Sequence, residues 1–264
     1  MISIGRNEKC PCMSGKKFKI CCERTGIWET LKKQGVTYYD ETFVLDEVLE
    51  KDDLFRRFYH NERFKLNKHL FIVQTDNTQS AASFGNFGDD AYIIFSKHSK
   101  FPVEDDVHLA HELEHLVLWS SGYKYIINYN PYTRAHKFIN DLLYDPIINK
   151  KLYEYGFDIP TYLKLSDEVQ MKIKPIGEDS LLISTLVVKR FLDYRNIYPE
   201  IKIHETDFYK STEKSYPDLI PLSHKILDVI DTIGITNTRS IELVMRNLIA
   251  IINRPELFNN IEIN

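Results

Sequence analysis

Cysteine is missing from most of this 264-residue chain, because all four cysteines lie between positions 10 and 22. The sequence also has no apolar run of 18 residues, so no membrane-spanning helix is predicted. Its first ten residues lack the apolar stretch of a secretory signal peptide. We therefore expect a cytoplasmic protein, and in a reducing compartment clustered cysteines favour metal binding over disulfide bonds.

The chain as a whole has no excess of positive charge: its net charge is −4 and its isoelectric point is near 6.2. This balance argues against DNA binding by the chain as a whole. Residues 1–26 are the exception, with six Lys or Arg against two Glu, a net charge of +4. The sequence thus predicts a small basic segment attached to an acidic body. The length suits one large domain, or a medium domain with an appendage.

The pattern of apolar residues predicts an α+β fold with a small sheet and a helical carboxy-terminal part. Residues 69–75 and 90–97 are rich in β-branched and aromatic residues, which is typical of strands, and the segment between them suits a loop or a hairpin arm. We expect 90–97 to be the edge strand, along which a peptide can add by β-augmentation. Helical spacing of apolar residues predicts helices at 43–60, 103–122, 133–146, 146–156, 181–195, 221–234 and 240–253, and residues 26–35 suit a short helix or a linker. Pro146 is expected to end or bend the helix that precedes it.

The amino-terminal cysteines follow the pattern Cys10-x-Cys12, then eight residues, then Cys21-Cys22. Four thiolates fill the tetrahedral coordination shell of one zinc ion, which makes such a site structural. About twenty residues cannot build a hydrophobic core, so metal binding would supply the folding free energy of this segment. Free or disulfide-bonded cysteines are the alternative.

The stretch "GRNEKCPCMSGKKFKICC" resembles the SEC-C motif, a small zinc-binding tail of the SecA translocation ATPase that also occurs fused to other domains. The resemblance covers residues 4–23, and Met13 departs from it because the family usually has glycine there. It implies Cys10, Cys12, Cys21 and Cys22 as ligands of a structural zinc. It also implies a docking module for a protein or a ribosome, without catalysis.

Residues 108–116, "HLAHELEHL", contain the pattern H-E-x-x-H at His111, Glu112 and His115. A step of four residues places two side chains one turn apart on the same face of an α-helix, so two imidazoles can bind one metal ion. Glu112 is offset by about 100° and suits a proton acceptor rather than a ligand. The flanking residues are apolar, and burying these groups without partners would cost several kcal/mol, which a metal would prevent. His108 and Glu114 are predicted to be bystanders.

This arrangement resembles the zincin metallopeptidases, and a catalytic zinc needs a third protein ligand. The gluzincin branch, which includes thermolysin, takes it from a downstream N-E-x-x-x-D pattern. Here "NDLLYD" at 140–145 fits that register with aspartate in the ligand position, as in the aspzincins. The resemblance implies Asp141 as the third zinc ligand and Asp145 as the residue that orients His111.

Two questions about this region stay open. Asp145 can instead cap a helix that begins with Pro146, or it can itself be the ligand; His136 and Glu154 are weaker candidates. A donor for the transition-state oxyanion is expected opposite Glu112, and the candidates are Tyr123, Tyr125, Tyr129, Tyr132 and His136.

We therefore predict a SEC-C-like motif at 1–26, a zincin-like domain at 27–164, and a helical region at 165–264 packed on it. The predicted function is zinc-dependent hydrolysis of peptide bonds in a protein or peptide substrate, with one catalytic and one structural zinc. The alternatives are a non-enzymatic protein that binds a partner, RNA or a ribosome, and a toxin or stress-response protease with the same chemistry.

Overall fold

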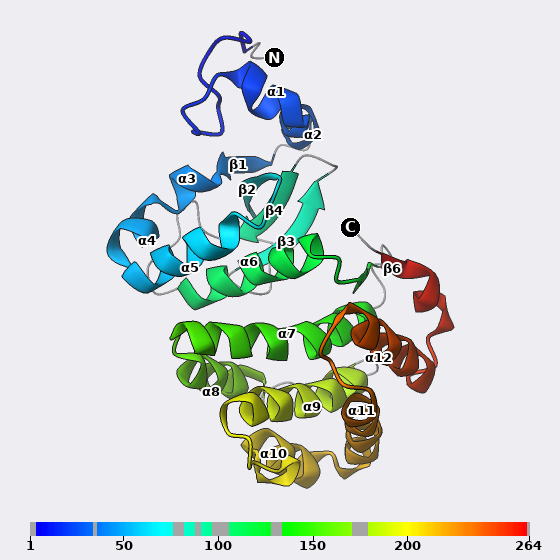
Figure 1. Ribbon diagram of the computed structural model, residues 1–264. Coiled ribbons are helices and arrows are strands. Elements are labelled where there is room, and N and C mark those ends of the chain that lie inside the picture. Colours follow the sequence, from blue (N-terminus) through cyan, green and yellow to red (C-terminus); the bar gives the residue numbers. More distant parts are fainter. Residues whose placement is uncertain are drawn as a thin grey trace. The chain divides into compact units, whose positions relative to one another are not determined.

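A computed structural model of the chain describes residues 4–33, 36–75, 82–87, 91–96, 106–127, 134–170 and 179–262. It confirms the α+β class: one four-stranded sheet with helices, followed by a helical carboxy-terminal part (Figure 1). In the described ranges, no helix combines the length and the apolar character needed to cross a membrane.

The chain forms two compact units, Met1–Ser120 and Ser121–Asn264. The point of division directly follows the helix that carries the H-E-x-x-H pattern and falls inside the predicted 27–164 domain. The predicted domain boundaries themselves stay predictions.

The first unit begins with short helical segments around the cysteines, which are η1 (Phe18–Ile20), α1 (Cys22–Thr25) and α2 (Ile27–Lys33). The predicted helix at 43–60 is divided into three, α3 (Glu41–Val44), α4 (Asp46–Lys51) and α5 (Asp53–Arg63). The last break lies at Asp52, whose side chain accepts hydrogen bonds from the backbone N–H groups of Leu54 and Phe55 at 2.9 Å. Asp52 therefore caps α5, and a cap requires non-helical backbone at that position.

The sheet has the strand order β1-β2-β4-β3, from β1 (Thr37–Asp40), β2 (His69–Gln74), β3 (Ala82–Phe87) and β4 (Ala91–Ser96). The predicted strands 69–75 and 90–97 are confirmed as β2 and β4. The prediction that 90–97 is the edge strand is wrong, because β4 pairs in parallel with β2 on one side and antiparallel with β3 on the other. The hairpin arm β3 therefore occupies that edge of the sheet.

The helix predicted at 103–122 corresponds to α6 (Asp106–Ser120), which packs against α5 and the strand pair β3–β4. Its apolar residues are almost fully shielded from solvent on several sides of the helix. The residues buried in this way are Leu109, Ala110, Leu113, Leu116, Val117 and Trp119. Such all-round burial is what keeps the ionisable groups of this helix in a low-dielectric setting.

The second unit is built around α7 (Ala135–Tyr155), which packs along α9 (Asp179–Ile197) and also contacts α8 (Ile159–Gln170) (Figure 1). Its other elements are β5 (Tyr125–Ile126), η3 (Ile203–Glu205), α10 (Asp207–Ser215), η4 (Pro217–Leu219), α11 (Ile220–Ile233), α12 (Thr238–Ile251), η5 (Pro255–Asn260) and β6 (Ile261–Glu262). The predicted helices at 181–195, 221–234 and 240–253 correspond to α9, α11 and α12.

The prediction at Pro146 is an end or a bend of the helix, and the end is wrong, because α7 continues through this proline to Tyr155. Proline removes one backbone hydrogen bond from a helix interior. Packing offsets this loss: Pro146 and its neighbours Asp145 and Ile148 are buried. In addition, the Nδ2 group of Asn196 on α9 donates a 2.9 Å hydrogen bond to the carbonyl oxygen of Pro146. Asp145 is consequently an interior helix residue and not an N-cap.

Candidate metal centres

The four cysteines form one compact group in the first unit. Their sulfur atoms lie within 4.8 Å of one another, and all four side chains are buried. The Cys12 and Cys21 sulfurs are 3.5 Å apart, and no pair forms a disulfide. Tetrahedral zinc with Zn–S bonds near 2.3 Å requires sulfur separations of about 3.8 Å. The cluster therefore has the dimensions of a four-thiolate metal site such as zinc occupies.

Local backbone hydrogen bonds hold the two cysteine pairs in this arrangement. The Cys10 N–H donates to the Lys16 carbonyl at 2.8 Å, and the Met13 N–H donates to the Cys10 carbonyl at 3.2 Å. The second pair follows η1, whose Phe18 carbonyl accepts a hydrogen bond from the Cys21 N–H at 3.1 Å. Two tight turns thus direct both pairs of sulfur atoms toward one another.

Crowding of the thiols sets their protonation. The neighbouring Cys21 raises the pKa of Cys12 to about 12, with Cys22, burial and Ser14 acting as further influences. Cys12 and Cys21 likewise raise the pKa of Cys22, while the pKa of Cys21 is lowered by Cys12. Without a cation, Cys21 favours the thiolate form beside the protonated thiols of Cys12 and Cys22. A bound metal ion supplies the positive charge that four thiolates require.

The cysteine cluster is part of the hydrophobic core of the first unit. It shares one contiguous buried cluster with Tyr38 of β1, Phe71 of β2 and Ile93 of β4. The Asp40 N–H donates to the Cys12 carbonyl at 2.7 Å, which joins the end of β1 to the metal-binding turn. The segment is therefore packed against the sheet rather than attached as a free tail.

A polar contact adds to this packing. The guanidinium of Arg24 donates a 2.8 Å hydrogen bond to Nε2 of His69, the first residue of β2. Burial, together with nearby Lys16 and Arg24, lowers the pKa of His69, so this imidazole is neutral at pH 7 and accepts through Nε2.

Met13 follows the first cysteine pair with a φ of 68°, in the left-handed region that favours glycine. Its side chain is 55% exposed, so little packing compensates for the backbone strain. Replacing Met13 by glycine should therefore raise the free energy of unfolding by about 0.5 kcal/mol, the strain of about 1 kcal/mol being partly offset by the greater entropy of glycine in the unfolded chain.

Urea unfolding of the zinc-loaded protein checks this prediction for Met13. Met13→Ala is the control, because alanine keeps the unfavourable φ. An equal stabilisation by alanine would show that the side chain, and not the backbone, is responsible.

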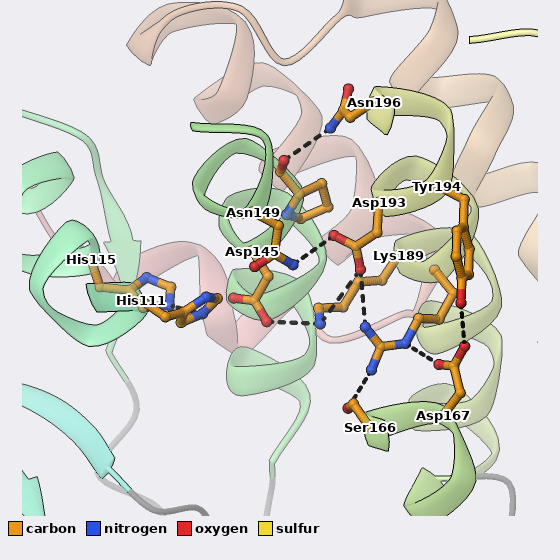
Figure 2. Close-up of polar contacts among 12 residues, drawn as sticks. His111, His115, Asp145, Asn149, Ser166, Asp167, Lys189, Asp193, Tyr194 and Asn196 are labelled. Carbon is orange, nitrogen blue, oxygen red and sulfur yellow. Dashed lines mark hydrogen bonds and ion pairs between the residues drawn. The ribbon is translucent and has the colours of Figure 1, made fainter. Parts of the chain in front are cut away.

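The structure brings His111 and His115 together on α6. Their Nε2 atoms are 3.1 Å apart, with the rings inclined by 73° (Figure 2). Two imidazole nitrogens bound to tetrahedral zinc at about 2.05 Å lie about 3.3 Å apart. Both side chains are buried, at 6% and 5% exposure. The pair therefore has the spacing of two ligands of one metal ion.

The two glutamates of the motif differ in burial. Glu112 is partly buried and directly follows His111 on α6. Glu114 is completely buried, with 0% exposure, and His108 is half-buried. Glu114 therefore belongs to the interior of the unit, whereas part of Glu112 remains exposed.

The "NDLLYD" residues lie on α7 in the second unit, and they have three different environments. The Asn140 amide bonds the backbone of Ile126 twice, with its oxygen accepting at 3.1 Å and its nitrogen donating at 2.9 Å, which holds β5 against α7. Asp141 is partly exposed and forms an ion pair with Lys137 at 3.3 Å. Asp145 is buried, and the Lys189 ammonium lies 2.9 Å from its carboxylate.

Asp145 belongs to a buried ionic group between α7, α8 and α9 (Figure 2). Lys189 lies between Asp145 and Asp193, and Arg190 binds both Asp193, at 3.1 Å, and Asp167. Desolvation opposes the charge of Arg190, but the carboxylates of Asp193 and Asp167 outweigh it and raise the pKa of the guanidinium. The group contains three carboxylates and two cations.

Sequence reasoning missed Lys189, Arg190 and Asp193. The signal was present, because these three charges directly follow the run "LLISTLVV" within the predicted helix 181–195 and alternate there with Phe191 and Leu192. A charge inside an apolar helical run indicates a buried ionic contact. Their partner on α7, however, becomes apparent only from tertiary packing.

The other candidates are distributed over the second unit. Tyr125 is buried and stacks on Tyr144 with ring centroids 4.2 Å apart, and Tyr123 is half-buried. His136 is partly buried on α7, and Glu154 is exposed near its end. Tyr129 and Tyr132 lie outside the described residues. No tyrosine is thereby identified as an oxyanion donor.

Comparison with known proteins supports the first centre. The model of the SEC-C motif matches residues 6–24, which contain all four cysteines. No curated protein and no solved structure matches the chain. The amino-terminal segment is thus a SEC-C motif with a cysteine cluster suited to a metal such as zinc.

Proposed function

We propose that this protein is a zinc-dependent peptidase whose catalytic helix is α6. The observation that carries the proposal is the 3.1 Å separation of the His111 and His115 Nε2 atoms on a buried helix, with the less buried Glu112 between them in sequence. Two convergent imidazoles and an adjacent carboxylate are the parts that metal-assisted hydrolysis requires.

The residues would divide the reaction between them. A zinc ion held by His111 and His115 would polarise the scissile carbonyl and lower the pKa of water. Glu112 accepts the proton of the attacking water and later returns it to the nitrogen of the leaving amine. The apolar surroundings of α6 strengthen these electrostatic interactions because they exclude bulk water.

Asp145 is our proposed third ligand, in preference to Asp141. Asp145 is the alternative ligand that the sequence left open, and its side chain is buried on α7, whereas Asp141 is partly exposed. In its ionic group three carboxylates accompany two cations, which favours a further positive charge nearby. Asp141 is the alternative ligand, and its partly exposed carboxylate forms an ion pair with Lys137.

Substitutions on α7 and α9 separate these alternatives. Asp145→Asn should lower the affinity for the zinc at His111 and His115 by about 10-fold or more, since it removes the anionic ligand. Lys189→Met breaks the same ion pair but leaves the carboxylate, and it should retain the metal. Asp141→Asn should also retain it. Zinc content after dialysis against a weak chelator is the measurement, and loss of zinc from Asp141→Asn with retention in Asp145→Asn would reverse the assignment.

Hydrolysis of a dye-quenched, unfolded casein tests the proposed activity. We expect cleavage that 1,10-phenanthroline abolishes and that added zinc restores. The contradicting result is a purified protein that holds two zinc ions per chain but cleaves neither casein nor a mixed peptide library. That result would exclude a general peptidase activity.

Docking through the SEC-C motif is a second candidate function, and the surface of the motif favours it. The motif exposes Met13 and Ile20, at 55% and 52%, beside several lysines and arginines. This combination suits an acidic partner with an apolar contact patch. Docking through the motif is compatible with the peptidase proposal, because the motif could bring the peptidase to its substrate.

A further inference from the structure

Tyr38 lies on β1, fourteen residues beyond the matched SEC-C motif, yet it packs in the same buried cluster as the four cysteines. Its ring is fixed between two aromatic neighbours. The centroid distances are 6.4 Å to Trp28 and 5.8 Å to Phe71, both in edge-to-face geometry. The direction of its hydroxyl group is therefore set by packing.

The hydroxyl of Tyr38 is buried with the cysteines. Among the described residues no nitrogen or oxygen atom accepts a hydrogen bond from it, and the four cysteines belong to the same buried cluster. Burial and, next, the Cys22 thiol raise the pKa of the Tyr38 phenol. A neutral thiol is a weak acceptor, whereas a thiolate accepts strongly. The orphaned phenol thus fits a cluster whose sulfurs are ionised by a bound metal.

We propose that Tyr38 donates its O–H to the Cys22 sulfur in the metal-loaded centre. Strand β1 then contributes a hydrogen bond to one of the metal ligands of the SEC-C motif. Partners of this kind orient metal ligands and adjust their basicity. The Cys22 thiolate keeps its place toward the metal because Tyr38 holds it from the side of the sheet.

A consequence follows for the rest of the first unit. β1 pairs with β2 over Thr37–Asp40, and the Asp40 N–H also bonds the Cys12 carbonyl. Metal binding and the order of this sheet edge are therefore coupled. By linkage, whatever weakens the Tyr38 contact must weaken metal binding, and loss of the metal must weaken β1.

Tyr38→Phe tests the proposal, because it removes the hydroxyl and keeps the ring. Competition with a chromogenic zinc chelator should show about a 10-fold loss of affinity at the cysteine centre. In the cobalt-substituted full-length protein, the sulfur-to-cobalt charge-transfer band should also shift, which a purely structural role would not produce.

Tyr59→Phe is the matched control. Tyr59 is similarly buried in the same unit, but its hydroxyl donates to Glu41 at 2.5 Å and not to the cysteine cluster. It should change stability and leave both metal readouts unaltered. Wild-type affinity and an unshifted band in Tyr38→Phe would overturn the proposal, as would equal effects from the two variants.

Discussion

Glu112→Gln is expected to lower kcat for hydrolysis of unfolded casein by about 10²–10⁴-fold, the usual contribution of a general base. Glutamine has nearly the same size but cannot accept the proton of water. Because Glu112 is not a ligand in this account, zinc content should remain that of the wild type. KM should change little, since the variant keeps the metal and the surrounding surface.

Two further variants make the result for Glu112 specific. Glu50→Gln alters an exposed glutamate on α4 and should leave kcat unchanged. His111→Ala should lose both activity and one zinc. If Glu112→Gln cleaves casein as fast as the native protein, Glu112 is not the base and the proposed mechanism is wrong.

Cys21→Ser should remove the structural metal and destabilise the first unit by at least about 3 kcal/mol, because structural zinc contributes folding free energy directly and typical domains are stable by only about 5–15 kcal/mol. The cause is the shared core: the cysteines pack with Tyr38 and Phe71 of the sheet. Loss of the metal leaves the remaining buried thiols in that core without the ion that they share.

Ser14→Ala is the control for Cys21→Ser. The Ser14 hydroxyl lies 3.4 Å from the Cys21 sulfur but is not a ligand, so this variant should keep its zinc. Thermal unfolding followed by circular dichroism, together with zinc content, is the measurement. A Cys21→Ser protein that melts like the wild type would show that the centre is dispensable for the fold.

Features encoded within a few residues could be predicted from the sequence. The cysteine cluster and the His111–His115 pair depend on spacing in a turn and in one helical turn, and the structure brings both together. The strands β2 and β4 and the helices α9, α11 and α12 follow from local periodicity in the same way.

Features that depend on tertiary packing could not be predicted. Pro146 was expected to end or bend a helix, but its burial and the hydrogen bond from Asn196 keep α7 continuous. The prediction of the edge strand was wrong because the edge depends on which strands pair with β4, and β2 and β3 occupy both of its sides. The link between Asp145 and Lys189 joins residues 44 positions apart, and no periodicity indicates it.

The number of zinc ions per chain tests the central claim most directly. Elemental analysis of the purified protein should give two, falling to one in His111→Ala and to one in Cys21→Ser. A single zinc that His111→Ala leaves in place and Cys21→Ser removes would contradict the account, because the histidine pair of α6 would then hold no metal.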